Sequence, residues 1–191
     1  MRGENVHLRA MEPEDLSLLY SWENDTDNWT VSNTTAPFSR HTLQRFIETS
    51  SQSFFTNQQI RLMVVENEHS QTVGCVDVFE YDPKHSRAGV GILIAEEYRQ
   101  KGYGLESLRL ILKYLFQQIG VHQVFCHIME NNHHSISIFQ KAGFQLCGRK
   151  REWIRTSDGW VDELTFQCFS EQKSLSSTTN PKNQHYASKL G

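Results

Sequence analysis

The chain has 191 residues, of which 38% are hydrophobic, and a formal net charge of −3 at pH 7. Its length favours one domain with a sizeable core. The slight negative charge argues against nonspecific binding to nucleic acid, which needs a basic surface, but it is compatible with a cationic substrate. Residues 1–10 lack the apolar core of a signal peptide, and no uninterrupted apolar run is long enough to span a bilayer. We therefore expect a cytoplasmic protein whose partners include neither a membrane nor a nucleic acid.

Cysteine and histidine usage gives no metal-binding pattern. The cysteines are widely spaced, form no Cys-x-x-Cys pair and lie among strand-forming residues, at Cys75, Cys126, Cys147 and Cys168. We expect them to be reduced core residues. His133 and His134 are adjacent, whereas helical metal ligands occur at positions i and i+4. We therefore place both at the surface at a helix start and expect no metal site.

The first part of the chain predicts a strand and two helices. Residues 5–10 have a strand-like alternation, and Pro13 followed by two acids is typical of a helix start. This helix is expected to end near Glu23. Ser39 is expected to cap a second helix that runs to about Ser50. A polar loop is predicted between the two helices.

This loop and the helix end before it carry acids beside tryptophan, at Glu23, Asp25, Asp27 and Trp29. One interpretation is a solvated loop. The other is a rim that binds a cationic substrate, because carboxylates pair with ammonium groups and aromatic faces attract cations.

Three strands and a long helix are predicted next. The strands cover residues 60–66, 72–81 and 87–94 and are joined by turn-like segments, which indicates an antiparallel meander. The helix has one buried face, marked by the spacing of Leu105, Leu108, Leu112, Leu115 and Ile119.

The turn before this helix is rich in glycine and positive charge, with the residues Arg99, Gln100, Lys101, Gly102, Tyr103 and Gly104. Glycine lets the backbone come close to a ligand, and the free amides and dipole of a helix N-terminus attract anions. The turn therefore indicates a phosphate or pyrophosphate site. A tight turn without any ligand is the alternative interpretation.

The last part of the predicted domain is strand-rich. A strand at residues 124–129 leads to a short helix at 135–142, which Gly143 ends as a left-handed cap. Strands at 144–154 and 160–169 follow, joined by an Asp-Gly hairpin turn.

Composition changes after Phe169. Residues 170–191 are polar and lack periodicity, which indicates a flexible tail. We therefore expect one domain at residues 1–169 and a tail at 170–191.

Three segments of the chain carry a resemblance to a known family. They are Arg99-x-x-Gly102-x-Gly104, the strand segment Gly91-Ile92-Leu93-Ile94 before it, and Asn132-x-x-Ser135-x-x-x-Phe139-x-x-x-Gly143-Phe144. In this order and spacing they resemble the pyrophosphate loop, the cofactor strand and the following helix of the GNAT superfamily of acetyl-CoA-dependent N-acyltransferases. The resemblance covers about residues 4–169 of the chain.

The resemblance implies a fold and a cosubstrate. The fold is α+β, with a central, mostly antiparallel twisted sheet of about six or seven strands, flanked by helices and splayed at the CoA-binding strands. The cosubstrate is acetyl-CoA. Backbone amides from Arg99 to Gly104 would hold its pyrophosphate, and its pantetheine arm would pair with Ile92, Leu93 and Ile94 like an added strand. Asn132, Ser135, Phe139 and Lys141 would complete the cofactor site.

The chemistry implied is direct attack by an amine on the thioester, which needs a proton acceptor. A backbone amide of residues 92–94 would polarise the thioester carbonyl. Glu80 is our first candidate for the base and Asp77 our second, since both lie on the strand beside the cofactor strand. Many relatives carry a tyrosine that protonates the leaving sulfur where this chain has Phe139. Ser135 and Tyr103 are therefore candidate acids, and departure of the thiolate without an acid is also open because a thiol pKa is about 8.5.

Within the superfamily the sequence is most similar to the spermidine and diamine N-acetyltransferases, notably from Phe79 to Ala88. A polyamine would be bound by several spaced acids and an aromatic ring, at Glu23, Asp25, Asp27, Trp29, Glu80 and Asp82. A protein N-terminal acetyltransferase of the ribosomal-protein type, an aminoglycoside acetyltransferase and a non-catalytic module that binds CoA or a polyamine are the alternatives. The resemblance also implies a homo-oligomer, at least a dimer.

Overall fold

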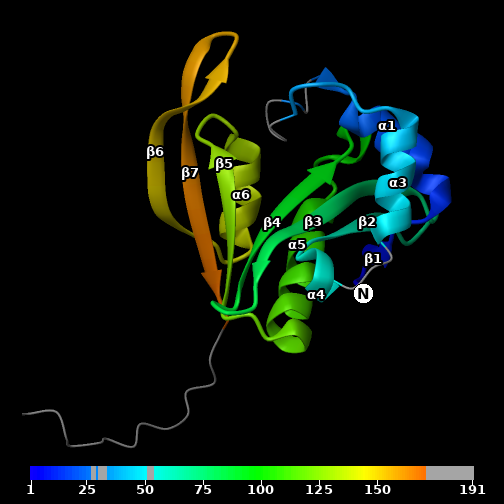
Figure 1. The fold of residues 1–191 in the computed structure, drawn as a ribbon. Helices are drawn as coiled ribbons and strands as arrows, with labels where there is room; N and C mark the ends of the chain where they lie inside the picture. Colours follow the sequence, from blue (N-terminus) through cyan, green and yellow to red (C-terminus); the bar gives the residue numbers. More distant parts are fainter. Residues whose placement is uncertain (27–28, 30–33, 51–53, 171–191) are drawn as a thin grey trace, which may run out of the picture.

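The computed structural model describes residues 1–26, 29, 34–50 and 54–170 (Figure 1). Its elements in chain order are β1 (Val6–Ala10), η1 (Pro13–Asp15), α1 (Leu16–Glu23), α3 (Arg40–Ser50), α4 (Phe54–Asn57), β2 (Ile60–Glu66), β3 (Thr72–Asp82), β4 (Arg87–Ile94), η2 (Glu96–Tyr98), α5 (Tyr103–Tyr114), a π-helical turn η3 (Leu115–Ile119), β5 (Gln123–Met129), α6 (His133–Lys141), β6 (Gln145–Thr156) and β7 (Gly159–Phe169). The order of strands and longer helices expected from the sequence is confirmed, and the short helix α4 is an element that the sequence analysis did not predict. The predicted tail lies outside the described residues except for Ser170.

The strands form one 7-stranded sheet in the order β1-β2-β3-β4-β5-β7-β6. Every neighbouring pair is antiparallel except β4 and β5, which are parallel. The β4–β5 pairing covers only Arg87–Gly89 against Gln123–Phe125. Beyond it the two strands diverge, as Figure 1 shows. The predicted α+β fold with a splayed, mostly antiparallel sheet is confirmed.

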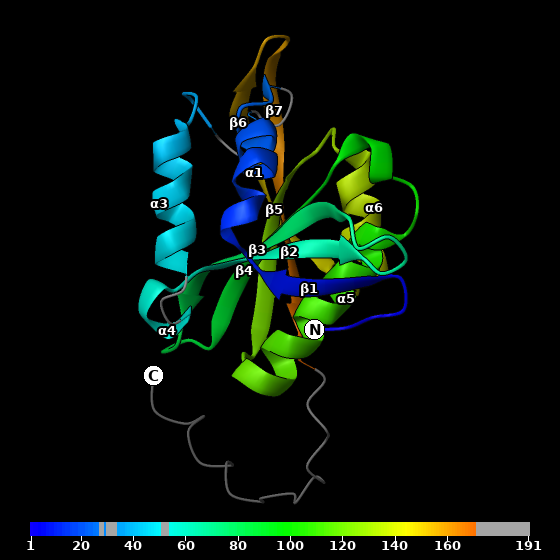
Figure 2. The ribbon, with the colours of Figure 1, turned by 90° about the vertical axis from the view of Figure 1, so that its right-hand side faces the viewer.

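Helices cover both faces of the sheet, and α3 and α6 lie on opposite sides of it (Figure 2). On one face, α5 contributes Leu108 and η3 contributes Leu115 to a core that includes Val76 and Val124. On the other face, α1 and α3 form a smaller core with β2 and β3 through Leu19, Leu43, Ile47, Met63 and Cys75. The second face is therefore covered over the N-terminal strands and lies open nearer the β6–β7 hairpin. Within the described residues, no helix is long and apolar enough to cross a membrane.

Helix α5, which the apolar spacing predicted from about Leu105, begins two residues before that, at Tyr103. Its N-cap is Gly102, which has a left-handed backbone. Leu108, Leu112 and Leu115 are buried as expected. Ser39 caps α3 by accepting the Thr42 N–H at 3.1 Å. In the expected loop after α1, Thr26 and Trp29 have helical backbone, while residues 27–28 and 30–33 lie outside the described residues.

One of the four cysteines departs from the core prediction. Cys75, Cys126 and Cys168 are buried reduced thiols, but Cys147 is exposed. The β6–β7 register shifts between Leu146 and Gly148, so Cys147 occupies a bulge. A bulged residue leaves the inward–outward alternation of its strand, which explains why the sequence pattern misplaced this thiol.

The start of the first helical segment is tied to the sheet by a bidentate ion pair. Both terminal nitrogens of Arg9 on β1 donate to the carboxylate of Asp15, at 2.7 and 2.8 Å. The same carboxylate accepts the Glu12 N–H at 2.9 Å. Asp15 is only 3% exposed, so these bonds replace the water that its charge would otherwise bind.

We expect Asp15→Asn to lower the free energy of unfolding by about 1–3 kcal/mol at pH 7, because a buried charged acceptor is lost. Burial alone would raise the pKa of Asp15, but the hydrogen bonds from Arg9 and the Glu12 N–H outweigh it and hold that pKa below its usual value. This stabilisation is therefore present above the unfolded-state pKa of about 3.9 and is lost as the pH falls through the lower folded-state pKa. Urea unfolding of wild type and Asp15→Asn at neutral and strongly acidic pH measures the difference in their free energies of unfolding. A difference that does not shrink in acid would contradict this explanation.

Candidate active site

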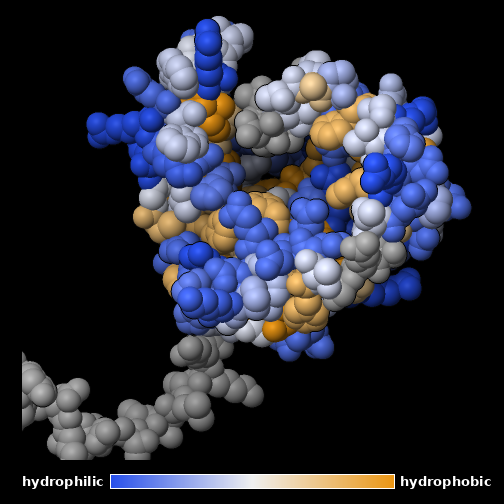
Figure 3. Space-filling model, viewed as in Figure 1, coloured by the Kyte–Doolittle hydropathy of each residue, from blue (hydrophilic) through white to orange (hydrophobic). Residues whose placement is uncertain are grey.

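A cavity of about 1330 Å³ runs from the open part of the second sheet face, past the diverging strands β4 and β5, to α5 and α6. Its walls come from α1, α3, the strands β2 and β3, the diverging strands β4 and β5, the N-terminal end of α5, both ends of α6, and the β6–β7 hairpin. Figure 3 shows a hollow between the hairpin and the α1–α3 side, with hydrophobic residues inside it. The lining divides into a half beside α5 and α6, called here the cofactor half, and a half beside α1, α3 and β7, called the acceptor half.

The cofactor half contains nearly all the residues that the sequence motifs predicted for CoA. The cavity is lined by Ile92, Leu93, Ile94, Arg99, Gln100, Gly102, Tyr103, Gly104, Asn132, Ser135, Phe139 and Lys141. Lys101 is the exception among the predicted set. Its ammonium group lies over the Tyr98 ring, 5.2 Å from the ring centroid, and its side chain is not part of the lining.

The glycine turn has the backbone of an anion site. Gln100 and Gly102 both have positive φ, at 64° and 83°. The first helical hydrogen bond of α5 runs from the Glu106 N–H to the Gly102 carbonyl, so the amides of residues 103–105 precede it without a helical acceptor. Arg99 Nε donates to the Ile94 carbonyl at 3.0 Å, which ties the turn to the end of β4. These amides and the helix dipole favour a phosphate at this point.

The divergence of β4 and β5 leaves room for an extended ligand beside the turn. Beyond Gly89, β4 keeps its pairing with β3 up to Ile94, while β5 keeps its pairing with β7 up to Met129. The inner edges of the two strands face a gap, where the polar backbone groups of β4 need partners other than a strand. A chain of alternating amides, such as a pantetheine arm, supplies donors and acceptors of this kind.

Helix α6 closes the cofactor half. The Asn132 side chain accepts the Ser135 N–H at 3.1 Å, so Asn132 is the N-cap of this helix as well as a lining residue. Phe139 is 3% exposed, and its ring centroid lies 5.0 Å from that of Phe144 in an edge-to-face contact. Phe139 therefore offers an apolar wall and no proton.

The acceptor half contains an ion-paired group that the sequence did not suggest. Arg61 on β2 lies opposite Asp77 on β3 in the strand register and binds its carboxylate with two nitrogens, at 2.6 and 3.0 Å. A third nitrogen of Arg61 donates to Glu23 at the end of α1. Burial opposes the charge of Arg61, but the carboxylates of Asp77 and Glu23 outweigh it and raise its pKa. Asp77, our second candidate base, therefore has its carboxylate bound to a guanidinium.

Glu80 occupies a bulge in β3. The β3–β4 register shifts between Phe79 and Asp82, and Glu80 has a φ of 48°. Simple alternation would give Glu80 the same face as Val76 and Val78, but the bulge turns it out to line the cavity and buries Tyr81 instead. A non-glycine residue held at positive φ carries strain that the surrounding structure must support.

A second group on β5 and β7 was also missed. His127 Nδ1 lies 3.2 Å from Thr165 Oγ1 and 3.6 Å from a carboxylate oxygen of Glu163. Glu163 also accepts a hydrogen bond from Lys150 Nζ at 2.6 Å. His127 and Glu163 line the cavity. The signal was available, because Val124, Cys126 and Ile128 are core residues and their neighbours in β5 must face the other way.

The remaining predicted substrate residues have other positions. Asp25 is exposed and is not in the cavity lining, and Trp29 donates its indole N–H to the Glu23 carbonyl at 2.8 Å. Asp82 pairs with Arg87 at 3.2 Å and lines a smaller neighbouring depression instead. Asp27 lies outside the described residues.

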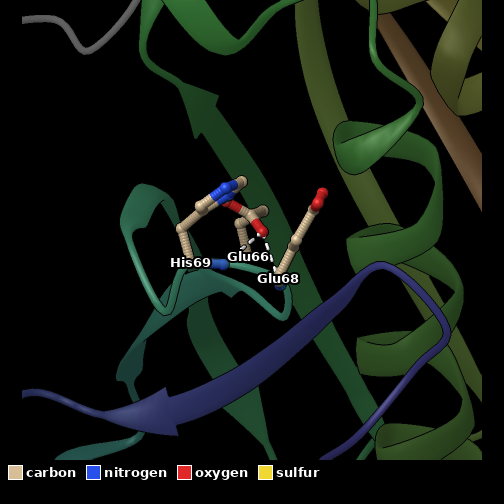
Figure 4. Close-up of side chains that lie close together, drawn as sticks. All are labelled: Glu66, Glu68 and His69. Atoms are coloured by element: carbon tan, nitrogen blue, oxygen red, sulfur yellow. Dashed lines mark hydrogen bonds and ion pairs between the residues drawn. The ribbon is translucent and has the colours of Figure 1, made fainter.

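Glu66, Glu68 and His69 gather at the β2–β3 turn (Figure 4), where one possible ligand atom from each lies within 4.8 Å of the others. The Glu66 carboxylate already accepts the backbone N–H groups of Glu68 and His69, which lower its pKa. This cluster is therefore explained as a capped turn.

Comparison with known proteins identifies the family. The family described as "Acetyltransferase (GNAT) domain" matches residues 5–145. The uncharacterised N-acetyltransferase YokL of a Bacillus subtilis prophage is 26% identical over 173 residues, which cover 91% of this chain and 94% of YokL. The spermidine N(1)-acetyltransferase of Escherichia coli K12 is 26% identical over 148 residues, which cover 76% of each chain.

A solved structure has the same fold. It is the spermidine N-acetyltransferase of Vibrio cholerae in complex with CoA and spermine, with a TM-score of 0.79 and 20% identity, and the match covers 88% of this chain and 97% of that one. The chain belongs to the GNAT acetyltransferase family. It is an N-acetyltransferase and uses acetyl-CoA as its acetyl donor. The helix N-terminus, the strand gap and the size of the cavity fit that cosubstrate.

We expect Gly102→Ala to weaken CoA binding by about tenfold or more, because a side chain at a φ of 83° is strained by about 1–2 kcal/mol and the amides of the turn would shift. Gly104→Ala is the matched control. A Cβ there meets its first neighbour, Ile138, at 3.4 Å, so we expect binding within about threefold of wild type. Calorimetric titration with CoA measures both, and equal losses would contradict the assignment.

Proposed function

We propose that this N-acetyltransferase acetylates a primary amine of a polyamine or diamine such as spermidine. The observation that carries the proposal is the acidic lining of the acceptor half, which among the described residues has four carboxylates, Glu23, Asp77, Glu80 and Glu163, and one arginine, Arg61. Aromatic rings of Trp22, Phe46 and Phe79 lie in the same lining. Carboxylates and ring faces attract ammonium groups, and their spread along the cavity suits a flexible polycation.

Glu80 is proposed as the base that accepts a proton from the acceptor amine, directly or through water. It lines the cavity from the bulged segment of β3, beside the cofactor strand β4. No described cation is paired with it by hydrogen bond or ion pair, whereas Asp77 is held by Arg61. Of our two candidates, Glu80 is therefore the more available.

The leaving thiol needs a proton or a hydrogen bond, and the chain offers two hydroxyl groups in the cofactor half. Desolvation and the carboxylates of Glu66, Glu68 and Glu106 raise the pKa of Tyr103, so its hydroxyl stays protonated. Glu66 and Glu68 belong to the β2–β3 turn, so Tyr103 lies toward that turn, at the end of the cavity where we propose that the pyrophosphate binds. Ser135, at the start of α6, remains the better-placed candidate for the sulfur.

A peptide N-terminus is the second candidate acceptor. The acceptor half lies between two separate parts of the fold, the α1–α3 pair and the β6–β7 hairpin, and is open to solvent, as a groove for a peptide end must be (Figure 3).

We also propose that the chain forms a homodimer or larger homo-oligomer in solution. Sedimentation should then give a mass above the 22.2 kDa of one chain.

The test of this function is thiol release from acetyl-CoA with a panel of putrescine, spermidine, spermine, an aminoglycoside and a peptide that begins with Ala or Ser. We expect turnover with the linear amines and little with the peptide. Turnover with the peptide alone would move the chain to the protein-acetylating group. If none of these amines gives thiol release while CoA still binds, the proposal is contradicted and a non-catalytic module is supported.

We expect Glu80→Gln to lower kcat by about 10²–10⁴-fold, the usual contribution of a positioned base, with CoA affinity unchanged. Glu14→Gln, at an exposed acid of η1 outside the cavity lining, is the control. A full rate in Glu80→Gln would transfer the base role to another group.

A further inference from the structure

Arg61 is the cation at the centre of the acceptor half. Its side chain is 16% exposed, and its guanidinium lies between the carboxylates of Glu23 and Asp77, which are 17% and 33% exposed. The Phe46 ring of α3 lies under it, with 5.4 Å between the guanidinium carbon and the ring centroid. Two carboxylates and an aromatic face are the surroundings in which proteins bind a substrate ammonium group.

Among the described residues, one other titratable group acts on Arg61, the thiol of Cys75. Cys75 lies close to it on β3, and burial raises the pKa of that thiol to about 12, so it is neutral at physiological pH. Arg61 with Glu23 and Asp77 therefore has a net charge of −1, where the two acids alone would have −2. The arginine takes up much of the negative charge that this part of the cavity would otherwise offer to a ligand.

The structure assigns to Arg61 the role of a specificity-determining residue: its guanidinium occupies the position of a substrate ammonium group and limits how many cationic groups of an amine the acceptor half can bind. This inference rests on the proposed function. It places the cationic groups of the acceptor on the Glu80 and Glu163 side of the cavity, and it makes long polyamines poorer ligands than the number of acids suggests.

A structural role alone would have a different consequence. Arg61 connects α1 to the sheet, and so does Arg9, which binds Asp15 just before α1 with the same bidentate geometry. Arg9 binds the Asp15 carboxylate with two nitrogens, as Arg61 binds Asp77, but Arg9 does not line the cavity. Substitution at either arginine should loosen the helix, but only substitution at Arg61 should change the charge that a ligand meets.

The test is calorimetric titration of the CoA-bound protein with spermine, spermidine and butylamine, which needs no turnover. We expect Arg61→Gln to bind spermine up to about fivefold more tightly than wild type does, since an added unpaired charge in a partly exposed site is worth up to about that factor. Butylamine should change by less than about twofold, because one ammonium group is already satisfied elsewhere. Arg61→Lys, which keeps the charge, and Arg9→Gln should both resemble wild type in selectivity.

Two further variants change the net charge of the group formed by Arg61, Glu23 and Asp77. Arg61→Gln combined with Asp77→Asn restores the net charge and should return spermine affinity to the wild-type level. If Arg61→Gln does not fold, Asp77→Asn alone brings the group to a net charge of zero and should weaken spermine binding relative to butylamine.

Unchanged or weaker spermine binding in Arg61→Gln would overturn the inference, as would an equal change in Arg9→Gln. Wild-type protein that binds these amines but never releases thiol would contradict the proposed function and leave the Arg61 result standing. Absence of any amine binding in wild type and in Arg61→Gln would overturn both.

Discussion

The short parallel contact between β4 and β5 is the constraint on which the site depends. It lasts for three residue pairs, after which each strand continues on its outer partner, β3 or β7. The sheet is thereby divided into two halves whose outer backbone groups are paired and whose inner edges are not. Unpaired backbone N–H and C=O groups must find other hydrogen-bond partners, so the gap suits an extended amide-containing ligand. Leaving these groups without either a ligand or water would cost free energy. The glycine turn at the start of α5 provides an anion site at the end of that gap.

The other half of the cavity depends on irregularity in β3. A regular strand would direct Glu80 toward the α5 face and leave Tyr81 facing the cavity. The bulge reverses both, and Tyr81 packs against Phe54, with ring centroids 4.7 Å apart. The burial of Tyr81 stabilises the strained backbone at Glu80, so a core contact supports an exposed acid in the site.

Much of this could be predicted from the sequence, where a local pattern sufficed. The turn from Arg99 to Gly104, the Asn132-x-x-Ser135 motif at the start of α6 and the order of strands all follow from short motifs and periodicity. The pairing of Arg61 with Glu23 could not, since it joins residues 38 positions apart. His127 and Glu163 could have been assigned to the cavity face by alternation, but the partner strands were unknown. Cys147 and Lys101 were misplaced because a bulge and a ring contact, neither visible in the sequence, set their directions.

The charges of the cavity follow the chemistry expected of its two substrates. Backbone amides, Arg99 and Lys141 lie in the half suited to an anionic cosubstrate, while acids predominate in the half suited to an amine. An amine must lose a proton before it can attack, so carboxylates that hold it too strongly in its charged form would oppose the reaction. Neutralising Asp77 and Glu23 with Arg61 moderates this effect near the cofactor strand. On the proposed function, the arrangement thus retains attraction for a cation at the cavity walls while limiting the negative charge near the cofactor strand.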